Sequence, residues 1–239
     1  MADVAWLNTN TSLHAGSASS LSGSQSVTSS GSDIVAVVNV TWDSNTGTTG
    51  ITVTDITYGG QAMTAAYSPV EYNSDGSRIF TCQQFWLANP PTGSNTLSIT
   101  FSSSDLDVYA VLTAYNNVNQ TTPVRPGTAT SNTGLTGDPS LTVTSNVHDL
   151  TTTVVSARGL GSGTTNQTSD AKNTSGSFDF ASDHATTAAA SVSHSWSGTS
   201  GLAWCIAGFS LQTDSGGFQA AWALTANQGV GFTQPAEFP

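Results

Sequence analysis

Imidazole and carboxylate side chains are the first candidates for chemistry in this chain, because acid–base and nucleophilic catalysis depend on such groups. Two of the four histidines adjoin an acid in the sequence, and the candidates are His14, His148-Asp149, Asp183-His184 and His194. Neighbouring residues of a strand point to opposite faces, so neither adjacent pair is expected to form a catalytic dyad. The chain also lacks a Gly-X-Ser-X-Gly motif and a Gly-rich phosphate loop followed by lysine. We therefore predict that the protein is not an enzyme and has no catalytic residues.

Oxygen ligands for a metal are suggested at two places. Residues 71–77, EYNSDGS, begin like a calcium loop, but the position that should carry the last glutamate is Cys82. A hairpin turn explains the same letters. Asp105 and Asp107 have the spacing to chelate from one strand face, but a solvated pair is the simpler interpretation. No Cys/His spacing indicates zinc, so we predict no metal and no cofactor.

The two cysteines lie in apolar segments, Cys82 in FTCQQFW and Cys205 in LAWCIAGF. Two buried thiols that act as small apolar side chains are the simplest interpretation. A disulfide between them is the alternative, since strands far apart in sequence can be neighbours in a sandwich.

Aromatic side chains are the remaining candidates for binding. Trp42, Trp86 and Trp204 lie in strongly apolar runs and are expected in the core. Trp196, between two serines, and Tyr72, in a predicted loop, are expected on the surface, where a sugar ring could stack on them. Trp196 and Tyr72 are therefore the predicted candidates for binding a glycan.

The charge balance limits the partners. The chain has four Lys and Arg against fifteen Asp and Glu, for a net charge of −11. Scattered cations cannot neutralise a run of phosphates, so neither direct nucleic-acid binding nor binding to an anionic membrane is expected. No run approaches the roughly 20 apolar residues of a membrane span. The amino terminus lacks the pattern of a secretory signal, which favours assembly in the cytoplasm.

Sequence patterns typical of β-strands run through the whole chain, and the strands that they predict must position the candidate residues. Short runs rich in Val, Ile, Thr and aromatic residues are separated by Gly-Gly, Asn-Pro-Pro and similar turns. They predict an all-β fold, an antiparallel, jelly-roll-like β-sandwich. IVAVVNVTW and LAWCIAGFSLQ should be central strands, whereas SLSGSQSV and TAAASVSHSW alternate and should be half exposed. Residues 125–139 and 159–175 are expected to be long loops.

The predicted organisation has three parts. Residues 1–33 hold an N-terminal arm and the first strands, 34–213 form the sandwich, and 214–239 form a C-terminal tail. A disordered tail would lack large apolar residues. Here it carries five candidates for docking on a partner, namely Phe218, Trp222, Leu224, Phe232 and Phe238. Packing on the same sandwich and docking on a neighbouring chain both explain these residues.

Several segments between Ile34 and Leu211 resemble a family of jelly-roll-like β-sandwich modules from bacteriophage virion proteins and bacterial surface proteins. They are ITYGGQAMT, FWLANPPTGSNTLSITF, AYNNVNQTTPV, SLTVTSNVHDLTTTVVSA and SWSGTSGLAWCIAGFSL. Their Gly-Gly and Asn-Pro-Pro turns serve backbone geometry, so the resemblance implies fold more strongly than function.

The resemblance implies a non-enzymatic bacteriophage structural protein, a capsid decoration or head protein located in the virion. Its expected partners are the major capsid protein or neighbouring copies, with a homo-oligomer as the natural assembly. Docking would use the terminal arms. The alternative is a carbohydrate-binding sandwich for host-surface glycans.

Overall fold

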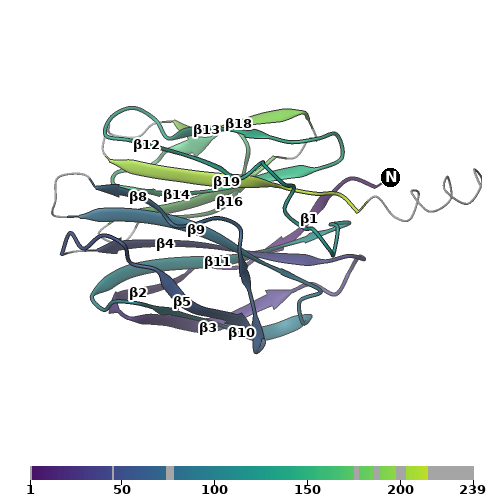
Figure 1. The fold of residues 1–239 in the computed structure, drawn as a ribbon, viewed down its shortest axis with the longest axis horizontal. Coiled ribbons are helices and arrows are strands. Elements are labelled where there is room, and N and C mark those ends of the chain that lie inside the picture. The colour runs from purple at the N-terminus through teal and green to yellow at the C-terminus, as the bar shows by residue number, and fades with distance from the viewer. Residues whose placement is uncertain are drawn as a thin grey trace, which may run out of the picture.

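Antiparallel strands make up the regular structure of this protein. The computed structural model describes residues 2–44, 46–73, 78–174, 178–185, 189–197 and 203–214. Within these ranges nineteen strands form four sheets, which stack as four layers (Figure 1). The predicted all-β antiparallel sandwich is confirmed.

Residues 5–116 build the first two layers, which we call roll 1. Its inner sheet has the order β1-β11-β4-β9-β7, with β2 also paired to β11 and β8 to β9, and its outer sheet has the order β3-β10-β5-β6. The strands are β1 (Ala5–Thr9), β2 (Leu13–Ala18), β3 (Ser20–Val27), β4 (Val35–Ser44), β5 (Val53–Tyr58), β6 (Gln61–Ala62), β7 (Thr64–Ala65), β8 (Val70–Asn73), β9 (Ile79–Ala88), β10 (Gly93–Phe101) and β11 (Leu106–Asn116).

Residues 130–211 build the other two layers, which we call roll 2. The inner sheet has the order β12-β19-β14-β17-β16, and the outer sheet has the order β13-β18-β15. The strands are β12 (Thr130–Gly134), β13 (Ser140–Thr144), β14 (Leu150–Ala157), β15 (Thr164–Thr165), β16 (Thr168–Asn173), β17 (Asp179–His184), β18 (Ser191–Ser197) and β19 (Trp204–Leu211).

The two rolls share one topology. Eight strands of roll 1 (β1, β3, β4, β5, β8, β9, β10 and β11) correspond in order to β12–β19 of roll 2. In each roll the first strand pairs with the eighth, the eighth with the third, the third with the sixth and the sixth with the fifth. The second strand pairs with the seventh, and the seventh with the fourth. Strands from the two halves of each roll thus interleave as in a jelly roll, and the chain contains two of them in tandem.

The rolls pack through their inner sheets in a reciprocal way. The first strand of roll 1, β1, lies beside the fifth strand of roll 2, β16, where Thr9 Oγ1 is 3.2 Å from Asp170 Oδ1. On the opposite side the fifth strand of roll 1, β8, lies beside the first strand of roll 2, β12. Such an exchange of equivalent patches is the pattern of an isologous dimer, here made within one chain.

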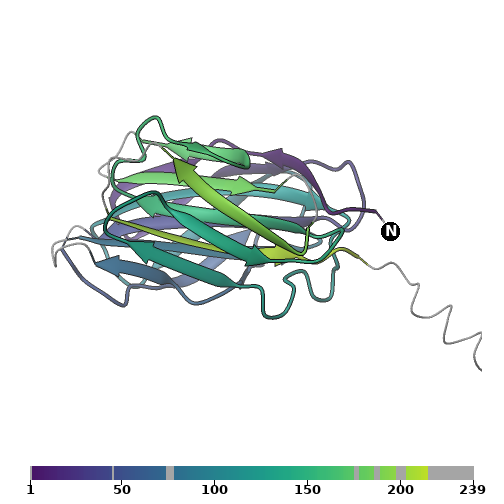
Figure 2. The ribbon, with the colours of Figure 1, turned by 90° about the horizontal axis from the view of Figure 1, so that it is seen from above.

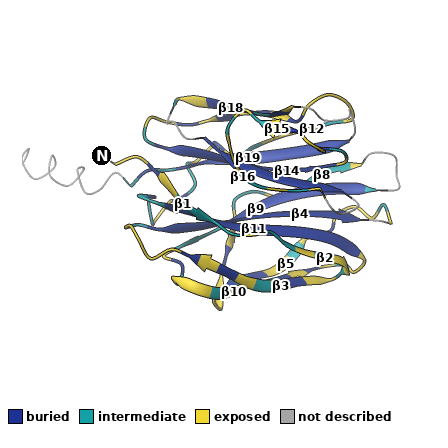
Figure 3. Ribbon diagram, turned by 180° about the vertical axis from the view of Figure 1, so that it is seen from behind, coloured by how far each residue is buried: buried dark blue, intermediate teal, exposed yellow. Residues whose placement is uncertain are grey.

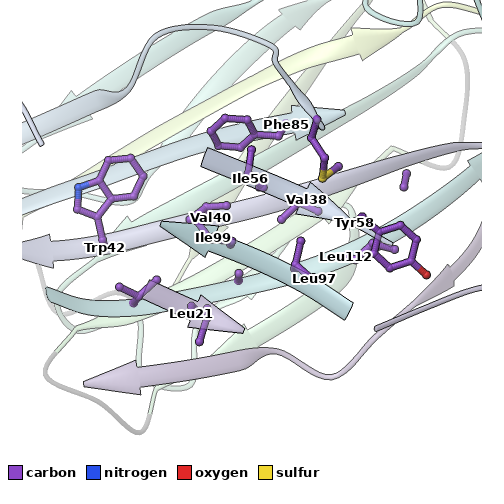
Figure 4. Packing of buried hydrophobic residues seen from close by; sticks show 14 of the residues in the cluster. Leu21, Val38, Val40, Trp42, Ile56, Tyr58, Phe85, Leu97, Ile99 and Leu112 are labelled. Carbon is purple, nitrogen blue, oxygen red and sulfur yellow. The ribbon is translucent and has the colours of Figure 1, made fainter. Parts of the chain in front are cut away.

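Burial follows from the layering. The inner strands β4, β14 and β19 are buried along their whole length, because another sheet covers each of their faces (Figure 3). Along β4, Val38, Val40 and Trp42 point into the core of roll 1, whereas Val35 and Val37 point toward roll 2. Figure 4 shows the core of roll 1 between its two sheets. The outer strands β3, β13 and β18 alternate between buried and exposed residues, as the sequence predicted.

The sheet edges are short, bulged or covered, which a chain poor in lysine requires. The longest outer edge, β3, is covered by side chains from the β1 region. Asn8 Nδ2 and Asn10 Nδ2 each donate to Ser26 O at 2.9 Å, and Ser26 N donates to Asn10 Oδ1 at 2.7 Å. Most of the remaining edges are strands of two to six residues, and β1, β2 and β16 have irregular registers.

The structure differs from the predicted organisation in two respects. Residues 1–33 supply β1, β2 and β3, so most of this segment belongs to the sheets of roll 1. The range 34–213, predicted as one sandwich, holds most of roll 1 and all of roll 2. The strands at the interface are as apolar as core strands, so no change of composition marks the boundary. The predicted loops 125–139 and 159–175 contain the polar strands β12, β15 and β16.

Cys82 and Cys205 are both free and buried at the interface between the rolls, which confirms the simpler interpretation of the two thiols. Among the described residues there is no helix whose length and apolar character would suit it to crossing a membrane.

Candidate functional site

A groove of about 680 Å³ opens at the junction of the two rolls, between the edge strands β1 and β16. Val4 and Trp6 of roll 1 and Leu150 of roll 2 give it an apolar wall. Thr9, Asp170 and His184 give it polar groups. Its volume is in the range of small-ligand sites, which often lie where two domains meet.

A β-bulge positions Asp170. In the pairing of β16 with β17, Ser169 lies opposite Asp183 and Ala171 opposite Ser182, so Asp170 is the extra residue. Bulges redirect a side chain and are frequent beside functional sites. Asp170 accepts hydrogen bonds from Thr9 Oγ1 at 3.2 Å, from Tyr115 Oη at 3.3 Å and from His184 Nδ1 at 2.7 Å. Its buried carboxylate is therefore fixed by three donors from three strands.

Asp170 sets the tautomer of His184. An ionised carboxylate only accepts hydrogen bonds, so Nδ1 carries the hydrogen and Nε2 is an acceptor in the neutral imidazole. His184 is only 4% exposed and lines the groove. Nε2 has no hydrogen bond to any described residue, yet it is not among the fully buried atoms that lack a partner. This nitrogen is therefore an acceptor that is open to the groove.

Trp6 forms the exposed wall of the groove. Its side chain is 47% exposed, although large apolar residues are usually buried. The indole lies parallel to the His184 ring, with centroids 6.3 Å apart, and its Nε1 donates to Thr9 Oγ1 at 3.0 Å. The adjacent β1 register is bulged between Trp6 and Asn8. One indole face therefore meets the imidazole, while much of the ring meets solvent.

Tyr115 is buried behind the groove and donates to Asp170 as a neutral hydroxyl. Burial, and next the negative charge of Asp170, raise the pKa of Tyr115 well above its usual value of 10.0. The hydroxyl consequently keeps its proton at neutral pH and can donate to the carboxylate.

This arrangement places an oriented hydrogen-bond acceptor at the groove. An oriented imidazole could act as a general base, but a nucleophile would have to lie within hydrogen-bonding reach of Nε2. No described Ser, Thr or Cys forms that hydrogen bond. Thr9, the hydroxyl nearest the dyad in the hydrogen-bond network, is already shared between Trp6 and Asp170.

A second histidine–aspartate pair has the connectivity of a catalytic triad but lies in the core of roll 2. His194 Nδ1 is 2.8 Å from Asp183 Oδ1, and its Nε2 is 2.9 Å from Thr151 Oγ1. Asp183 also accepts from Thr153 and Thr165. His194 and Asp183 are completely buried, so this network holds the two sheets of roll 2 together.

The adjacent pairs of the sequence separate in the structure, as strand geometry predicted. His148 pairs with Asp3 at 2.5 Å, while Asp149 pairs with Arg125. His184 points to the groove and Asp183 to the opposite face of β17.

The predicted glycan residues do not form a surface site. Trp196 is 1% exposed and packs in the core of roll 2, so its expected surface position is wrong. Val192, His194 and Trp196 alternate along β18 and share its buried face. Tyr72 is half-buried on β8 and packs against the core between the rolls. The structure brings neither of them near the groove.

The remaining predicted sites are the possible metal ligands and the docking residues of the tail. Asp107 pairs with His14 at 2.6 Å. Across the described ranges, no group of three or more His, Cys, Asp and Glu side chains could hold a metal ion. Residues 74–77 of the calcium-like segment lie outside the described residues. The five docking residues of the tail, Phe218, Trp222, Leu224, Phe232 and Phe238, also lie outside them.

The reciprocal packing creates a second, equivalent junction, where β8 lies beside β12. That junction has a smaller hollow of about 300 Å³, lined by residues such as Tyr67, Val70 and Thr130. Among the described residues, its lining includes no tryptophan, histidine or carboxylate. The Trp6–His184–Asp170 group is thus not needed to join the rolls, since the equivalent junction forms without one.

Comparison of the chain with family models, with curated proteins and with solved structures gives no match. The groove is therefore interpreted from its own geometry. Sequence reasoning listed His184 among its candidates but missed Asp170 and Trp6, and of these two only Trp6, an aromatic residue in the polar segment AWLNTNT, gave a signal that could have found the groove.

Proposed function

We propose that this protein is a non-enzymatic virion structural protein, a capsid decoration or head component that docks on neighbouring subunits through its terminal segments. Its partners would be the major capsid protein or further copies of this chain. Assembly in the host cytoplasm and a homo-oligomeric state belong to the same proposal.

One observation carries the proposal: the two ends of the described chain meet. Thr213 Oγ1 donates to Ala2 O at 2.9 Å, although the residues lie at opposite ends of the sequence. The N-terminal end and the last described residues also lie together in two perpendicular views (Figures 1 and 2). Residues 215–239, with their aromatic side chains, therefore follow directly from this end of the molecule.

Buried polar contacts anchor this end. Asp149 is buried, pairs with Arg125 and accepts from Thr213 N at 2.9 Å. Asp214 N donates to Asn117 O at 2.9 Å, and Val4 N donates to His148 O at 2.9 Å. A docking segment that leaves a fixed point loses less entropy on binding than one that leaves a frayed end.

Three further properties favour a structural role. The surface is poor in charge, and the long β3 edge is covered by side chains, which limits uncontrolled pairing. Jelly rolls recur in capsids and in lectins. In the described part of the chain, no hydroxyl or thiol is bonded to Nε2 of the open histidine–aspartate pair. Fold alone does not decide function, so the terminal end is the part to test.

The test compares the full chain with a chain that ends at Asp214, in a phage that encodes this protein. We expect the full chain to sediment with purified particles and the shortened chain to stay in the supernatant. Both chains should melt at the same temperature, because the described strands end at Leu211. A shortened chain that still decorates particles, or a full chain absent from particles, would refute the proposal.

Carbohydrate binding remains the second candidate function. Trp196 is buried and Tyr72 packs on the core, so these residues do not support it. The groove at Trp6 does support it, and this groove borders the terminal end through Asp3 and Val4.

A further inference from the structure

We infer that the groove between β1 and β16 binds a neutral saccharide, with Trp6 as the stacking platform and His184 Nε2 as an acceptor for a hydroxyl group. This inference goes beyond the proposed assembly role and does not rest on it, although Asp3 and Val4 of the N-terminal end also line the groove.

The exposed indole supplies the apolar half of sugar recognition. One face of a pyranose ring carries C–H groups, and such faces stack on tryptophan. Trp6 is 47% exposed and is held by its hydrogen bond to Thr9 and by the His184 ring. A platform held in this way loses little conformational freedom when a ligand binds.

The oriented imidazole supplies the polar half. His184 is almost completely buried, its Nδ1 is occupied by Asp170, and its Nε2 has no partner among the described residues. Because Nε2 is open to the groove and oriented by Asp170, a ligand hydroxyl can donate to it in place of a water molecule. Thr168 and Ser169 add further polar groups to the same lining.

Charge selects against other ligands. Asp3 and Asp170 line the groove, and none of the described residues in its lining is Lys or Arg. An anionic ligand such as a sulfated or sialylated sugar would meet two carboxylates without a cation. A basic peptide has no free carboxylate to pair with, because Asp3 pairs with His148 and Asp170 is satisfied by three donors. An uncharged ligand rich in hydroxyl groups is not repelled by the carboxylates and needs no free carboxylate to pair with.

Trp6, His184 and Asp170 are not required for packing the two rolls together, as the equivalent junction of β8 with β12 indicates. The hollow between β8 and β12 joins the same strands of the two rolls without a tryptophan or a His–Asp pair. The buried dyad and the exposed indole occur together at one junction only of the described chain.

The experiment is a saturation-transfer NMR screen of the full chain. The neutral probes are glucose, galactose, mannose, N-acetylglucosamine, cellobiose, maltose and lactose, each at millimolar concentration. The charged probes are N-acetylneuraminic acid, glucose 6-sulfate and tetralysine. We expect at least one neutral sugar to bind, with its C–H face closest to the protein, and no charged probe to compete with it.

Variants locate the site. Trp6→Ala should weaken the binding of the neutral sugar by about tenfold or more, whereas Trp6→Phe, which keeps an aromatic face, should weaken it by only about threefold. Leu135→Ala is the matched control, because Leu135 is 54% exposed and lies on the loop after β12, away from the groove. It should leave binding unchanged.

A direct measurement covers the case that Trp6→Ala does not fold. The indole N–H signal of Trp6, assigned by its loss in Trp6→Phe, should shift when the sugar is added to the unaltered protein. Absence of binding by every neutral probe would overturn the inference. Sugar binding that Trp6→Ala does not weaken would also overturn it, as would sugar binding that does not shift the Trp6 signal. Preferential binding of a charged probe would do the same.

Discussion

Burial decides what each histidine–aspartate pair contributes, and all four histidines of this chain form such a pair. The pairs are His14–Asp107, His148–Asp3, His184–Asp170 and His194–Asp183. The His148–Asp3 pair is exposed, the His184–Asp170 pair borders the groove, and the His194–Asp183 pair is completely buried. A histidine paired with an aspartate is therefore a surface contact in the first pair, an oriented hydrogen-bond acceptor in the second and a link between the two sheets of a core in the third.

Replacement of His194 should strongly destabilise the protein. His194→Ala leaves the Asp183 carboxylate in the core with one donor fewer and removes the partner of Thr151. Breaking a buried pair by removing one member costs about 3 to 5 kcal/mol. Urea unfolding monitored by tryptophan fluorescence measures this loss.

His148→Ala is the matched control, because it breaks an exposed pair of the same kind. Exposed pairs contribute at most about 1 kcal/mol, so its midpoint should stay close to that of the unaltered protein. Equal losses from the two variants would contradict the assignment of His194 as a core link.

Alkaline pH should destabilise the fold through the buried Tyr115, the partly buried Tyr67 and the buried Cys82 thiol. Burial, together with the charges of neighbouring groups, raises the pKa of Tyr115 and Tyr67 well above 10.0 and that of Cys82 well above 9.0. These groups keep their protons in the folded state when the unfolded chain releases them. Their contribution is complete below about pH 9 and is lost above it, at up to about 1.4 kcal/mol per pH unit for each group.

Unfolding free energies measured between pH 7 and pH 11 test this dependence. We expect a plateau at the lower end and a decline that begins near pH 9. In Cys82→Ala, which lacks the group with the lowest usual pKa, the decline should begin nearer pH 10. Stability that rises with pH in this range would contradict the proposed cause.

The tryptophans show what residue-level reasoning could and could not predict. Trp42 and Trp204 are buried, as their apolar neighbours predicted, whereas Trp86 is only partly buried. Trp196 has serine on both sides, but those serines belong to the other face of β18 and say nothing about its own. Trp6 is exposed at a bulged edge, whose position depends on how the two rolls meet.

At the scale of the strands, close backbone packing around β19 should make any side chain larger than glycine destabilising at position 208. A Cβ atom at Gly208 would lie 2.6 Å from Thr152 O and 2.7 Å from Thr153 Cγ2. Overpacking of a core typically costs about 1 to 3 kcal/mol, and β14 on one side and β12 on the other leave little room for relaxation. Gly208→Ala should therefore lower the free energy of unfolding by that amount, as measured by urea denaturation.

Gly16→Ala provides the comparison within another strand. A Cβ atom at Gly16 on β2 meets nothing within 4 Å. Alanine there should be neutral or slightly stabilising, because it reduces the freedom of the unfolded chain. A Gly208→Ala variant as stable as Gly16→Ala would show that β19 is packed less tightly than described.

Strand prediction succeeded where both faces or one face of a strand are buried. The continuous run of β4 and the alternation of β3 follow directly from sheets that cover two faces or one. The edge strand β16, TSDAKN, has neither pattern, since it is polar and bulged at Asp170. The carboxylate of the candidate site was therefore hidden in a segment predicted as a loop.

At the scale of the whole molecule, the two rolls should unfold as one unit. Their inner sheets bury Val35, Phe80 and Tyr115 of roll 1 against roll 2. Separation would expose these residues in a contiguous apolar face. Calorimetry should show one transition, with a calorimetric enthalpy equal to the van't Hoff enthalpy. Two resolved transitions would contradict this coupling.

The duplicated topology could not be predicted from the sequence. Corresponding strands share pairing partners but not letters, as β1, AWLNT, and β12, TSNTG, illustrate. The shared feature is the order in which strands pair, which depends on contacts between distant residues. The sequence pattern predicted the jelly-roll class, and the three-dimensional pairing was needed to count two rolls.

A reconstruction of particles that carry this protein tests the central proposal most directly. The account predicts that the contact with the neighbouring subunit forms at the end where Ala2 and Thr213 meet, with density for residues 215–239 on the partner. A contact made through the exposed face of β3 and β10, with Ala2 and Thr213 facing solvent, would contradict it.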